Sequence, residues 1–448
     1  MSEADSFQNQ ATLKDHDAEV EETVVQAISD DNIPKLESLL GAIQMENVPE
    51  IVTEVINYAI DQRSSDIHIE PNTDEVHIRY RVDGVLQVIT SYPISLHPAI
   101  VSRVKIISNL KIDEQRIPQD GRAKFITQNP ITKETFEADL RVSTFPTVTG
   151  EKIVMRIQDK SAKIPALQDL GVRGNNLKSL NKIIKSPHGV VLLSGPTGSG
   201  KTTTMYAILQ EINKPEINIL TLEDPVEYQM SGLNQSQVRP DIGYSFAEGL
   251  RTALRQDPDV IMIGEMRDME TMEIAIRAAL TGHLVLSTIH TNSAVETITR
   301  IRDMGIADYL TTSAVKGIIA QRLVRQICPH CKESVQPSDE VFEDIKQEIE
   351  TMPKNQFIDP KLLEDVVIYR GKGCDICNNT GYVGRTGIYE VLLIDDDIKD
   401  LVQKSQSIDD MQKAARIHGM LTLKQDGILK VLEGITSIEE IYRVTSND

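Results

Sequence analysis

Apolar and polar residues alternate along the first third of the chain in short runs that predict strands. Two of these runs are separated by a Pro-Asn-Thr-Asp turn and predict a β-hairpin. Helices are expected after Pro49 and over residues 98–110. We therefore expect an α+β domain built on an antiparallel sheet over residues 47–160. The expected strands include residues 65–70, 75–82, 122–127, 135–143 and 152–158.

After Gly171 the apolar runs become continuous, which is typical of strands that are buried on both faces of a parallel sheet. Segments with helical spacing of apolar residues, 205–212 and 249–256, lie between these runs. This alternation of strands and helices predicts an α/β domain over residues 161–325. The expected strands are residues 190–193, 217–222, 260–263 and 284–288.

The remaining segments have other patterns. Residues 1–46 are acidic and are expected to be partly disordered, with one or two short amphipathic helices between about residues 22 and 43. Residues 326–395 carry four cysteines and predict a metal-binding subdomain, in which residues 333–360 form an insertion. Residues 396–448 predict a small helical C-terminal region.

Composition narrows the class of protein. The 448 residues carry a net charge of −20, and aromatic residues make up 4% without any tryptophan, which argues against a surface that binds nucleic acid. No apolar run reaches the roughly 20 residues that span a bilayer, and the N-terminus lacks the pattern of a signal peptide. We therefore expect a cytoplasmic protein of several domains.

A glycine-rich phosphate-binding pattern lies between the expected strand 190–193 and the helix behind it. Its glycines allow backbone N–H groups to surround a phosphate, and the helix adds the positive end of its dipole. Its lysine would contact the β- and γ-phosphates, and a hydroxyl would ligate Mg²⁺. The expected nucleotide-binding residues are Gly195, Pro196, Thr197, Gly198, Ser199, Gly200, Lys201, Thr202 and Thr203, with Thr202 as the magnesium ligand.

Polar residues next to the expected strands supply candidates for catalysis. Glu223 and Glu265 each follow a buried strand, where carboxylates manage Mg²⁺ and the attacking water in phosphate-loop enzymes. His283 and His290 flank the strand 284–288. The sequence therefore predicts carboxylates beside the phosphate loop, whereas the pattern alone favours structural histidines.

Two pairs of arginines allow two interpretations. Arg251 and Arg255 are four residues apart and share one helix face. Arg141 and Arg156 lie on the polar faces of expected strands. From the pattern alone, each pair either covers a solvated surface or contacts a phosphate.

The four cysteines form two C-x-x-C pairs, Cys328 with Cys331 and Cys374 with Cys377. Four thiolates in two such knuckles suit tetrahedral Zn²⁺. Redox-active pairs are the alternative, although no thioredoxin-like pattern surrounds them.

Several sequence blocks occur in the order that is typical of one family. Together with the phosphate loop, they make the chain similar to the ATPases of bacterial type II secretion and type IV pilus assembly over about residues 64–444. The four-cysteine motif makes the chain similar to the assembly and secretion branch of this family, because pilus retraction ATPases typically lack that motif. The blocks include SSDIHIE, RYRVDGVL, RIPQDGR, TLEDPVEY, LRQDPDVIMIGEMRD, TGHLVLSTIHTNSA and GRTGIYEVL.

The resemblance implies a RecA-like ATPase domain preceded by a PAS-like domain. Arg141 and Arg156 match arginines that the PAS-like domain contributes to the nucleotide. Arg251 and Arg255 match further phosphate-proximal arginines of the family. These matches favour the second interpretation for both pairs.

The resemblance also implies roles for the carboxylates and the histidines. Glu265 would act on Mg²⁺ and its bound water, and Glu223 is favoured as the residue that activates the attacking water, with the opposite assignment left open. His283 and His290 would sense the nucleotide state or couple subunits.

The implied activity is ATP hydrolysis by a homo-hexamer, with ATP, Mg²⁺ and Zn²⁺ as cofactors, to drive type II protein secretion through pseudopilus assembly. The ring would be recruited to the cytoplasmic face of the inner membrane. Its implied partners are a platform protein of that membrane and a docking component of the machine. Extension of a type IV pilus is the alternative function; a RecA-like nucleic-acid motor and a non-hydrolysing nucleotide-gated adaptor are two others.

Overall fold

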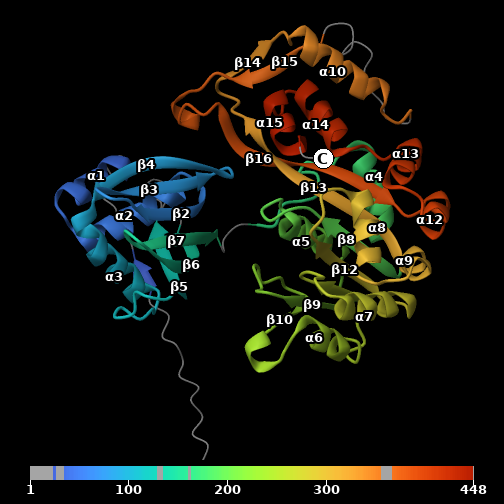
Figure 1. Ribbon diagram of the computed structural model, residues 1–448, viewed down its shortest axis with the longest axis horizontal. Helices are drawn as coiled ribbons and strands as arrows, with labels where there is room; N and C mark the ends of the chain where they lie inside the picture. The colour runs from blue at the N-terminus through green and yellow to red at the C-terminus, as the bar shows by residue number, and fades with distance from the viewer. Residues whose placement is uncertain (1–23, 27–34, 129–134, 160–162, 355–365, 447–448) are drawn as a thin grey trace, which may run out of the picture. The chain divides into compact units, whose positions relative to one another are not determined.

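The computed structural model describes residues 24–26, 35–128, 135–159, 163–354 and 366–446 (Figure 1). The chain forms two compact units, Met1–Ser161 and Ala162–Asp448. The disorder expected for residues 1–21 lies outside the described residues. The division into five segments stays a prediction.

A seven-stranded sheet forms the centre of the first unit. Its strands lie in the order β1-β5-β6-β7-β2-β3-β4. Neighbouring strands are antiparallel except for β1 and β5, which are parallel. The strands are β1 (Val24–Gln26), β2 (Ser64–Pro71), β3 (Glu75–Val82), β4 (Val85–Pro93), β5 (Gln119–Gln128), β6 (Thr135–Thr147) and β7 (Gly150–Asp159).

Three helices, α1 (Lys35–Gln44), α2 (Val48–Asp61) and α3 (His97–Ile107), share one core with this sheet. Alternate strand residues such as Leu140 and Val142 point into that core. Because side chains alternate along a strand, the polar residues between them lie on the opposite face of the sheet. The expected hairpin and the helix after Pro49 are therefore confirmed.

The prediction of helix is wrong for residues 24–26, which form β1. Their backbone pairs with residues 124–126 of β5 at the edge of the sheet. An open sheet edge offers hydrogen bonds to an extended segment, and such tertiary pairing outweighs a weak local helical spacing. The helical part is confirmed as α1, which packs on α2 and so belongs to the first unit.

A second seven-stranded sheet organises the second unit. Strands β10, β9, β11, β12, β8 and β13 run parallel in that order, and β16 pairs antiparallel with β13. All four strands expected from apolar runs are present. The strands are β8 (Gly189–Ser194), β9 (Ile219–Glu223), β10 (Leu233–Gln237), β11 (Val260–Ile263), β12 (Leu284–Ile289), β13 (Val315–Ile327) and β16 (Tyr382–Leu393).

Helices cover both faces of the second sheet. In β8, Val191 and Leu193 belong to the core formed with α4 and α5, whereas Val190 and Leu192 belong to the core formed with α6 to α9. Burial on both faces explains why these strands are continuous apolar runs. The helices are α4 (Gly174–Ile184), α5 (Lys201–Ile212), α6 (Phe246–Ala253), α7 (Met269–Leu280), α8 (Ala294–Asp303) and α9 (Asp308–Ala314).

The C-terminal helices are present, but they belong to two cores. Figure 1 shows α12 (Asp396–Gln403) and α13 (Ile408–Ile417) beside α8 and α9, whose core they share. By contrast, α14 (Leu423–Leu432) and α15 (Ile438–Thr445) pack with a segment that follows the first cysteine pair. That segment contains α10 (Asp339–Glu350), β14 (Lys332–Val335) and β15 (Ile368–Gly371). The expected insertion therefore carries a helix of its own.

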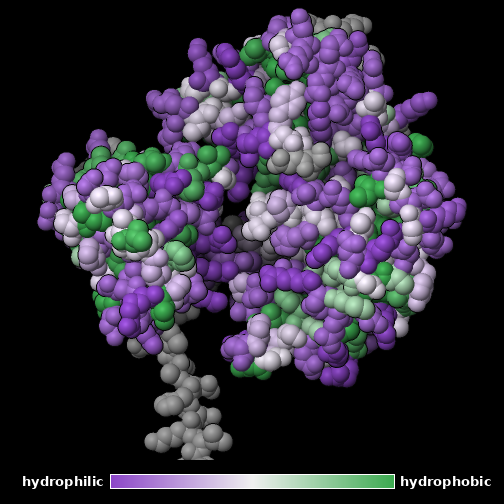
Figure 2. Space-filling model, in the orientation of Figure 1, coloured by the Kyte–Doolittle hydropathy of each residue, from purple (hydrophilic) through white to green (hydrophobic). Residues whose placement is uncertain are grey.

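The surface seen in Figure 2 is mainly hydrophilic, with apolar residues in small separate groups. Over the described ranges, no helix is both long enough and apolar enough to cross a membrane.

Candidate functional site

The glycine-rich loop joins the end of β8 to the start of α5, at the carboxyl edge of the parallel sheet. Gly195, Gly198 and Gly200 have φ angles of 146°, 79° and 87°, which residues with a side chain rarely adopt. A Cβ on Gly195 would lie 2.6 Å from the carbonyl oxygen of Gln321 on β13. The glycines therefore allow the loop to pack against β13 and to end at the positive end of the helix dipole.

Lys201 is the buried cation of this loop. Its Nζ donates to the carbonyl oxygens of Gly195 at 2.7 Å and Pro196 at 3.0 Å. Burial lowers the pKa of Lys201 to about 8; Glu265 opposes this shift and Arg322 adds to it. Phosphate oxygens would therefore supply the negative charge that this ammonium lacks. Thr202, on the first turn of α5, is exposed, so its hydroxyl is accessible to a ligand.

Glu265 and His290 lie beside Lys201. Glu265 follows β11, and its Oε2 lies 3.7 Å from Nε2 of His290, which follows β12. Its Oε1 lies 2.5 Å from the guanidinium of Arg267. Burial lowers the pKa of His290, and Lys201 lowers it further, while Glu265 opposes the shift. The structure therefore brings together one carboxylate, one imidazole and the phosphate-loop lysine.

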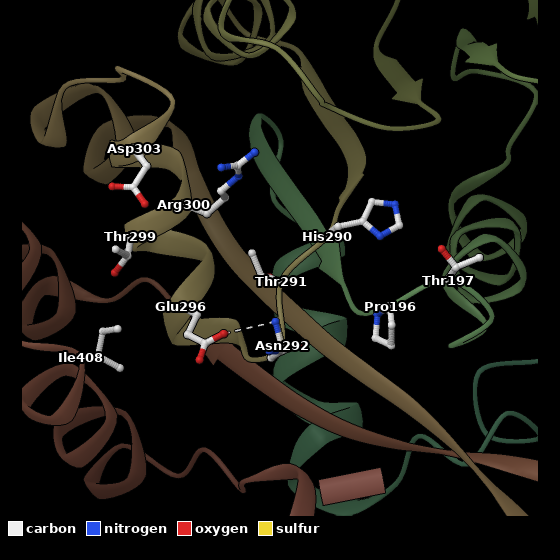
Figure 3. A pocket seen from close by; sticks show the side chains of 10 residues that line it. All are labelled: Pro196, Thr197, His290, Thr291, Asn292, Glu296, Thr299, Arg300, Asp303 and Ile408. Carbon is white, nitrogen blue, oxygen red and sulfur yellow. Dashed lines mark hydrogen bonds between the residues drawn. The ribbon is translucent and has the colours of Figure 1, made fainter. Parts of the chain in front are cut away.

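A cleft of about 640 Å³ opens at this place (Figure 3). The phosphate-loop residues Pro196 and Thr197 face side chains of α8 across it, and His290 lies between them. The backbone N–H of Asn292 donates to Glu296 at 3.2 Å and fixes the loop after β12. The loop therefore borders a solvent-filled space that admits a polar ligand. The remaining lining residues are Thr291, Thr299, Arg300, Asp303 and Ile408.

Glu223, at the end of β9, is more enclosed than Glu265. Its side chain accepts hydrogen bonds from three residues of the same unit. Tyr206 donates to Oε2, whereas Thr221 at 2.5 Å and Gln235 at 3.1 Å donate to Oε1. Three donors fix this carboxylate in one orientation.

His283 is not brought to the phosphate loop of its own chain. It precedes β12, whereas His290 follows it. A strand of this length spans roughly 20 Å at about 3.3 Å per residue, so the two histidines lie at opposite edges of the sheet. The Nδ1 of His283 is 2.9 Å from the carbonyl oxygen of Ala278. A role at the phosphates of the same subunit is therefore excluded by the sheet geometry.

Arg251 and Arg255 lie in and just after α6, which ends near the amino edge of β9. Asn218, which precedes β9, donates to the carbonyl oxygen of Gln256 just beyond these arginines. Arg251 pairs with Glu270, and Arg255 donates to the carbonyl oxygen of Arg251 at 3.0 Å. The role of these two arginines at a phosphate stays a prediction.

Arg141 and Arg156 are direct cross-strand partners in the first unit, on β6 and β7. They lie on the face opposite the helices, as predicted. The same transverse row continues through Asp66 on β2 to Arg81 on β3. Asp66 accepts from Nε of Arg156 at 3.0 Å and lies 3.4 Å from Nε of Arg81. At the other end, Arg122 on β5 pairs with Arg141.

The four cysteines form one cluster. Cys328 and Cys331 follow β13, and Cys374 and Cys377 lie at the short helix η3 (Asp375–Cys377). Their sulfurs all lie within 4.8 Å of one another, and three of the separations are 3.7, 3.8 and 3.9 Å. Tetrahedral Zn–S bonds of about 2.3 Å require sulfur separations of about 3.8 Å, so the donor set fits zinc.

The model of the family described as type II/IV secretion system protein matches residues 42–443. The chain belongs to this family. The predictions of a secretion-family ATPase fold and of an ATP hydrolase are thereby confirmed at the level of the family.

Relatives within the type II/IV secretion family agree with this assignment. The chain is 44% identical to the type II secretion system ATPase E of Vibrio cholerae, over 93% of this chain and 78% of that protein. It is 43% identical to the type IV pilus assembly ATPase PilB of Thermus thermophilus, over 88% of this chain but 43% of that protein. The solved structure of the ATPase DotB from Legionella pneumophila shares the fold, with a TM-score of 0.60, 20% identity, and 88% and 95% of the two chains covered.

Two residues on β13 that border this secretion-family site were not predicted from sequence. Gln321 on β13 accepts from Thr204 of α5 at 2.8 Å and touches the phosphate loop. Arg322 donates to the carbonyl oxygen of Asn292 at 2.9 Å and so reaches the loop after β12. Both residues follow the apolar start of β13, and only the pairing of β13 with β8 reveals their position.

Proposed function

We propose that this chain binds ATP with Mg²⁺ at the loop of residues 195–203 and hydrolyses it. The observation that carries this proposal is the approach of Glu265 and His290 to the buried Lys201 at one edge of the sheet. Lys201 and the loop N–H groups would hold the phosphates, and the exposed hydroxyl of Thr202 would hold the metal. Mg²⁺, when bound, neutralises charge that develops on the phosphate oxygens.

Glu223 and Glu265 would act on the water molecules of the reaction. Glu265, which lies 3.7 Å from the cleft residue His290, would orient water that is bound to the metal. Glu223, held by three donors, would accept a hydrogen bond from the attacking water and align it with the γ-phosphate. The Tyr206, Thr221 and Gln235 contacts support a fixed orientation of Glu223. His290 would report the charge on the phosphates through its contact with Glu265.

Phosphate release from the full-length chain tests both assignments. Glu223→Gln and Glu265→Gln should each lower kcat by on the order of 100-fold while ATP still binds. Glu216→Gln, at an exposed position in the loop after α5, is the matched control and should keep normal turnover. Normal turnover in both site variants would reject the assignment.

We also propose that Arg141 and Arg156 contact the nucleotide when the protein assembles. Their position on one exposed face, next to Arg122, concentrates positive charge that suits a triphosphate. Helices on one face of an antiparallel sheet support a PAS-like identity for this unit. Arg141→Ala should leave ATP affinity largely intact and depress hydrolysis; an unchanged rate would make Arg141 a surface residue.

The biological role that we propose is to drive type II protein secretion through pseudopilus assembly, as a homo-hexamer at the cytoplasmic face of the inner membrane. A platform protein and a docking component would be its partners. The 44% identity to the type II secretion system ATPase E of Vibrio cholerae over 93% of this chain supports this choice. Deletion of the gene, with secreted proteins and surface pili measured in parallel, tests it: loss of pili alone would favour type IV pilus extension.

We propose further that the cysteine cluster binds Zn²⁺ in a structural site. Four sulfur donors leave no open position for a reaction. Backbone N–H groups of Gly373 and Gly381 donate to cysteine sulfurs at 3.3 and 3.2 Å, which stabilises thiolates. Metal analysis of the purified chain should find about one zinc ion per chain, and none in a Cys374→Ser variant.

A further inference from the structure

Tyr206 lies on the second turn of α5, five residues after Lys201, and is fully buried. Its hydroxyl donates to Oε2 of Glu223 on β9. The Tyr206 hydroxyl oxygen itself accepts from the backbone N–H groups of Glu227 at 3.3 Å and Tyr228 at 3.4 Å. One phenol therefore joins the helix behind the phosphate loop to the carboxylate and to the turn that follows it.

The direction of this hydrogen bond follows from the surroundings of the phenol. Burial raises the pKa of Tyr206, and the hydrogen bond to Glu223 raises it further. The hydroxyl therefore keeps its proton and acts as the donor. The ring meets that of Tyr228 edge-on, with centroids 5.5 Å apart, so the position of the oxygen is fixed by packing as well.

We propose that Tyr206 is a positioning residue for ATP hydrolysis. It couples phosphate binding at the loop to the orientation of the Glu223 carboxylate. This inference rests on the proposed role of Glu223 at the attacking water. Lys201 and Tyr206 belong to one rigid helix, so a movement of α5 toward bound phosphates also moves the phenol. The carboxylate follows because the phenol donates to its Oε2, while Thr221 and Gln235 hold Oε1.

The same contact has a purely structural alternative, in which Tyr206 satisfies a buried carboxylate and nothing more. The two alternatives differ in kinetics. A displacement of about 1 Å in a positioned group costs on the order of 100-fold in rate, and a water-orienting group acts on kcat more than on ATP binding. A structural contact would instead lower thermal stability without a selective effect on kcat.

Tyr206→Phe separates these alternatives because it removes only the hydroxyl and keeps the ring. In the full-length protein we expect kcat to fall by about 10- to 100-fold while KM for ATP stays within about 2-fold. In a Glu223→Gln background, the same substitution should lower kcat by less than about 2-fold further, because residues that act through one another are not additive. Tyr80→Phe is the matched control: Tyr80 is also fully buried, and its hydroxyl donates to the carbonyl oxygen of Val55 at 2.6 Å. It should lose stability and keep its kcat.

The outcomes distinguish this inference from the function on which it rests. If Glu223→Gln keeps normal turnover, the role of Glu223 is wrong. If Glu223→Gln loses turnover but Tyr206→Phe does not, or if the two losses multiply, only the role of Tyr206 is wrong. Should Tyr206→Phe fail to fold, Thr221→Val removes another donor to the same carboxylate. Unchanged kcat in that variant would overturn positioning of Glu223 by these donors.

Discussion

Replacement of Asp66 by asparagine should slow hydrolysis through Arg156 while it leaves the fold intact. The Asp66 side chain is 8% exposed and lies between Arg156 and Arg81 in the transverse row of the first sheet. Asparagine keeps the shape and one acceptor oxygen but loses the charge. Arg156 would then keep a hydrogen bond to a neutral acceptor but lose its ion pair with the carboxylate, and so would be held less firmly.

The structure sets the size of the expected effects. The Arg156 and Arg81 side chains are 59% and 36% exposed, and exposed ion pairs contribute about 0.2–1 kcal/mol each. We therefore expect a stability loss of about 1 kcal/mol. An arginine at a transferring phosphate is worth about 10³-fold or more, and Arg156 is loosened but not removed. We expect kcat to fall by on the order of 10-fold, with KM for ATP little changed.

The assay is steady-state phosphate release together with thermal unfolding of the full-length protein. Glu70→Gln is the control, because Glu70 lies on the same strand and face and pairs with Arg79 and Lys152 at 2.8 Å each. It should lose stability but not kcat. If Asp66→Asn matches Glu70→Gln in turnover, or if its effect multiplies with that of Arg156→Ala, the carboxylate does not act through Arg156.

Four further predictions follow from single contacts. Burial alone would raise the pKa of Glu70, but Lys152 and Arg79 lower it to about 2. The ion pairs of Glu70 therefore stabilise the fold above pH 4.5, and this stabilisation is lost as the pH falls toward 2. Acid unfolding of Glu70→Gln should therefore depend less on pH over this range. Cys331→Ser, or a strong chelator, should lower the melting temperature of the second unit, whereas an unchanged value would argue against a structural metal. Gly195→Ala should abolish nucleotide binding in a titration with labelled ATP, because its Cβ would lie 2.6 Å from a backbone oxygen of β13. Arg255→Ala should leave the ATP affinity of the dilute protein within about 2-fold, and a larger loss would show contact within one subunit.

The hydrophobic pattern predicts most of the second unit because its strands are buried on both faces and its helices on one. The motif also identifies the turn at Gly195 to Lys201, since few residues tolerate its backbone angles. By contrast, β1 depends on an open edge of β5 far along the chain, so local spacing gave the wrong element.

The sequence likewise predicted the position of some residues of the candidate site and not of others. Lys201 and Glu265 were predicted at one edge because the carboxyl ends of parallel strands meet there, whereas the role of His290 came from the family resemblance. His283 was grouped with His290 by the family resemblance, and the strand between them keeps them at opposite edges of the sheet. Tyr206 belongs to no sequence motif and resembles the other core residues of α5. Only the packing of that helix over β9 reveals its contact with Glu223.

ATP hydrolysis by the full-length protein, compared with that of Lys201→Ala, tests most directly whether the loop after β8 is the site of the reaction. With saturating ATP and Mg²⁺, the unaltered protein should release phosphate steadily, and the variant should lose at least about 100-fold in rate together with its affinity for labelled ATP. Equal phosphate release by the two proteins would contradict the assignment.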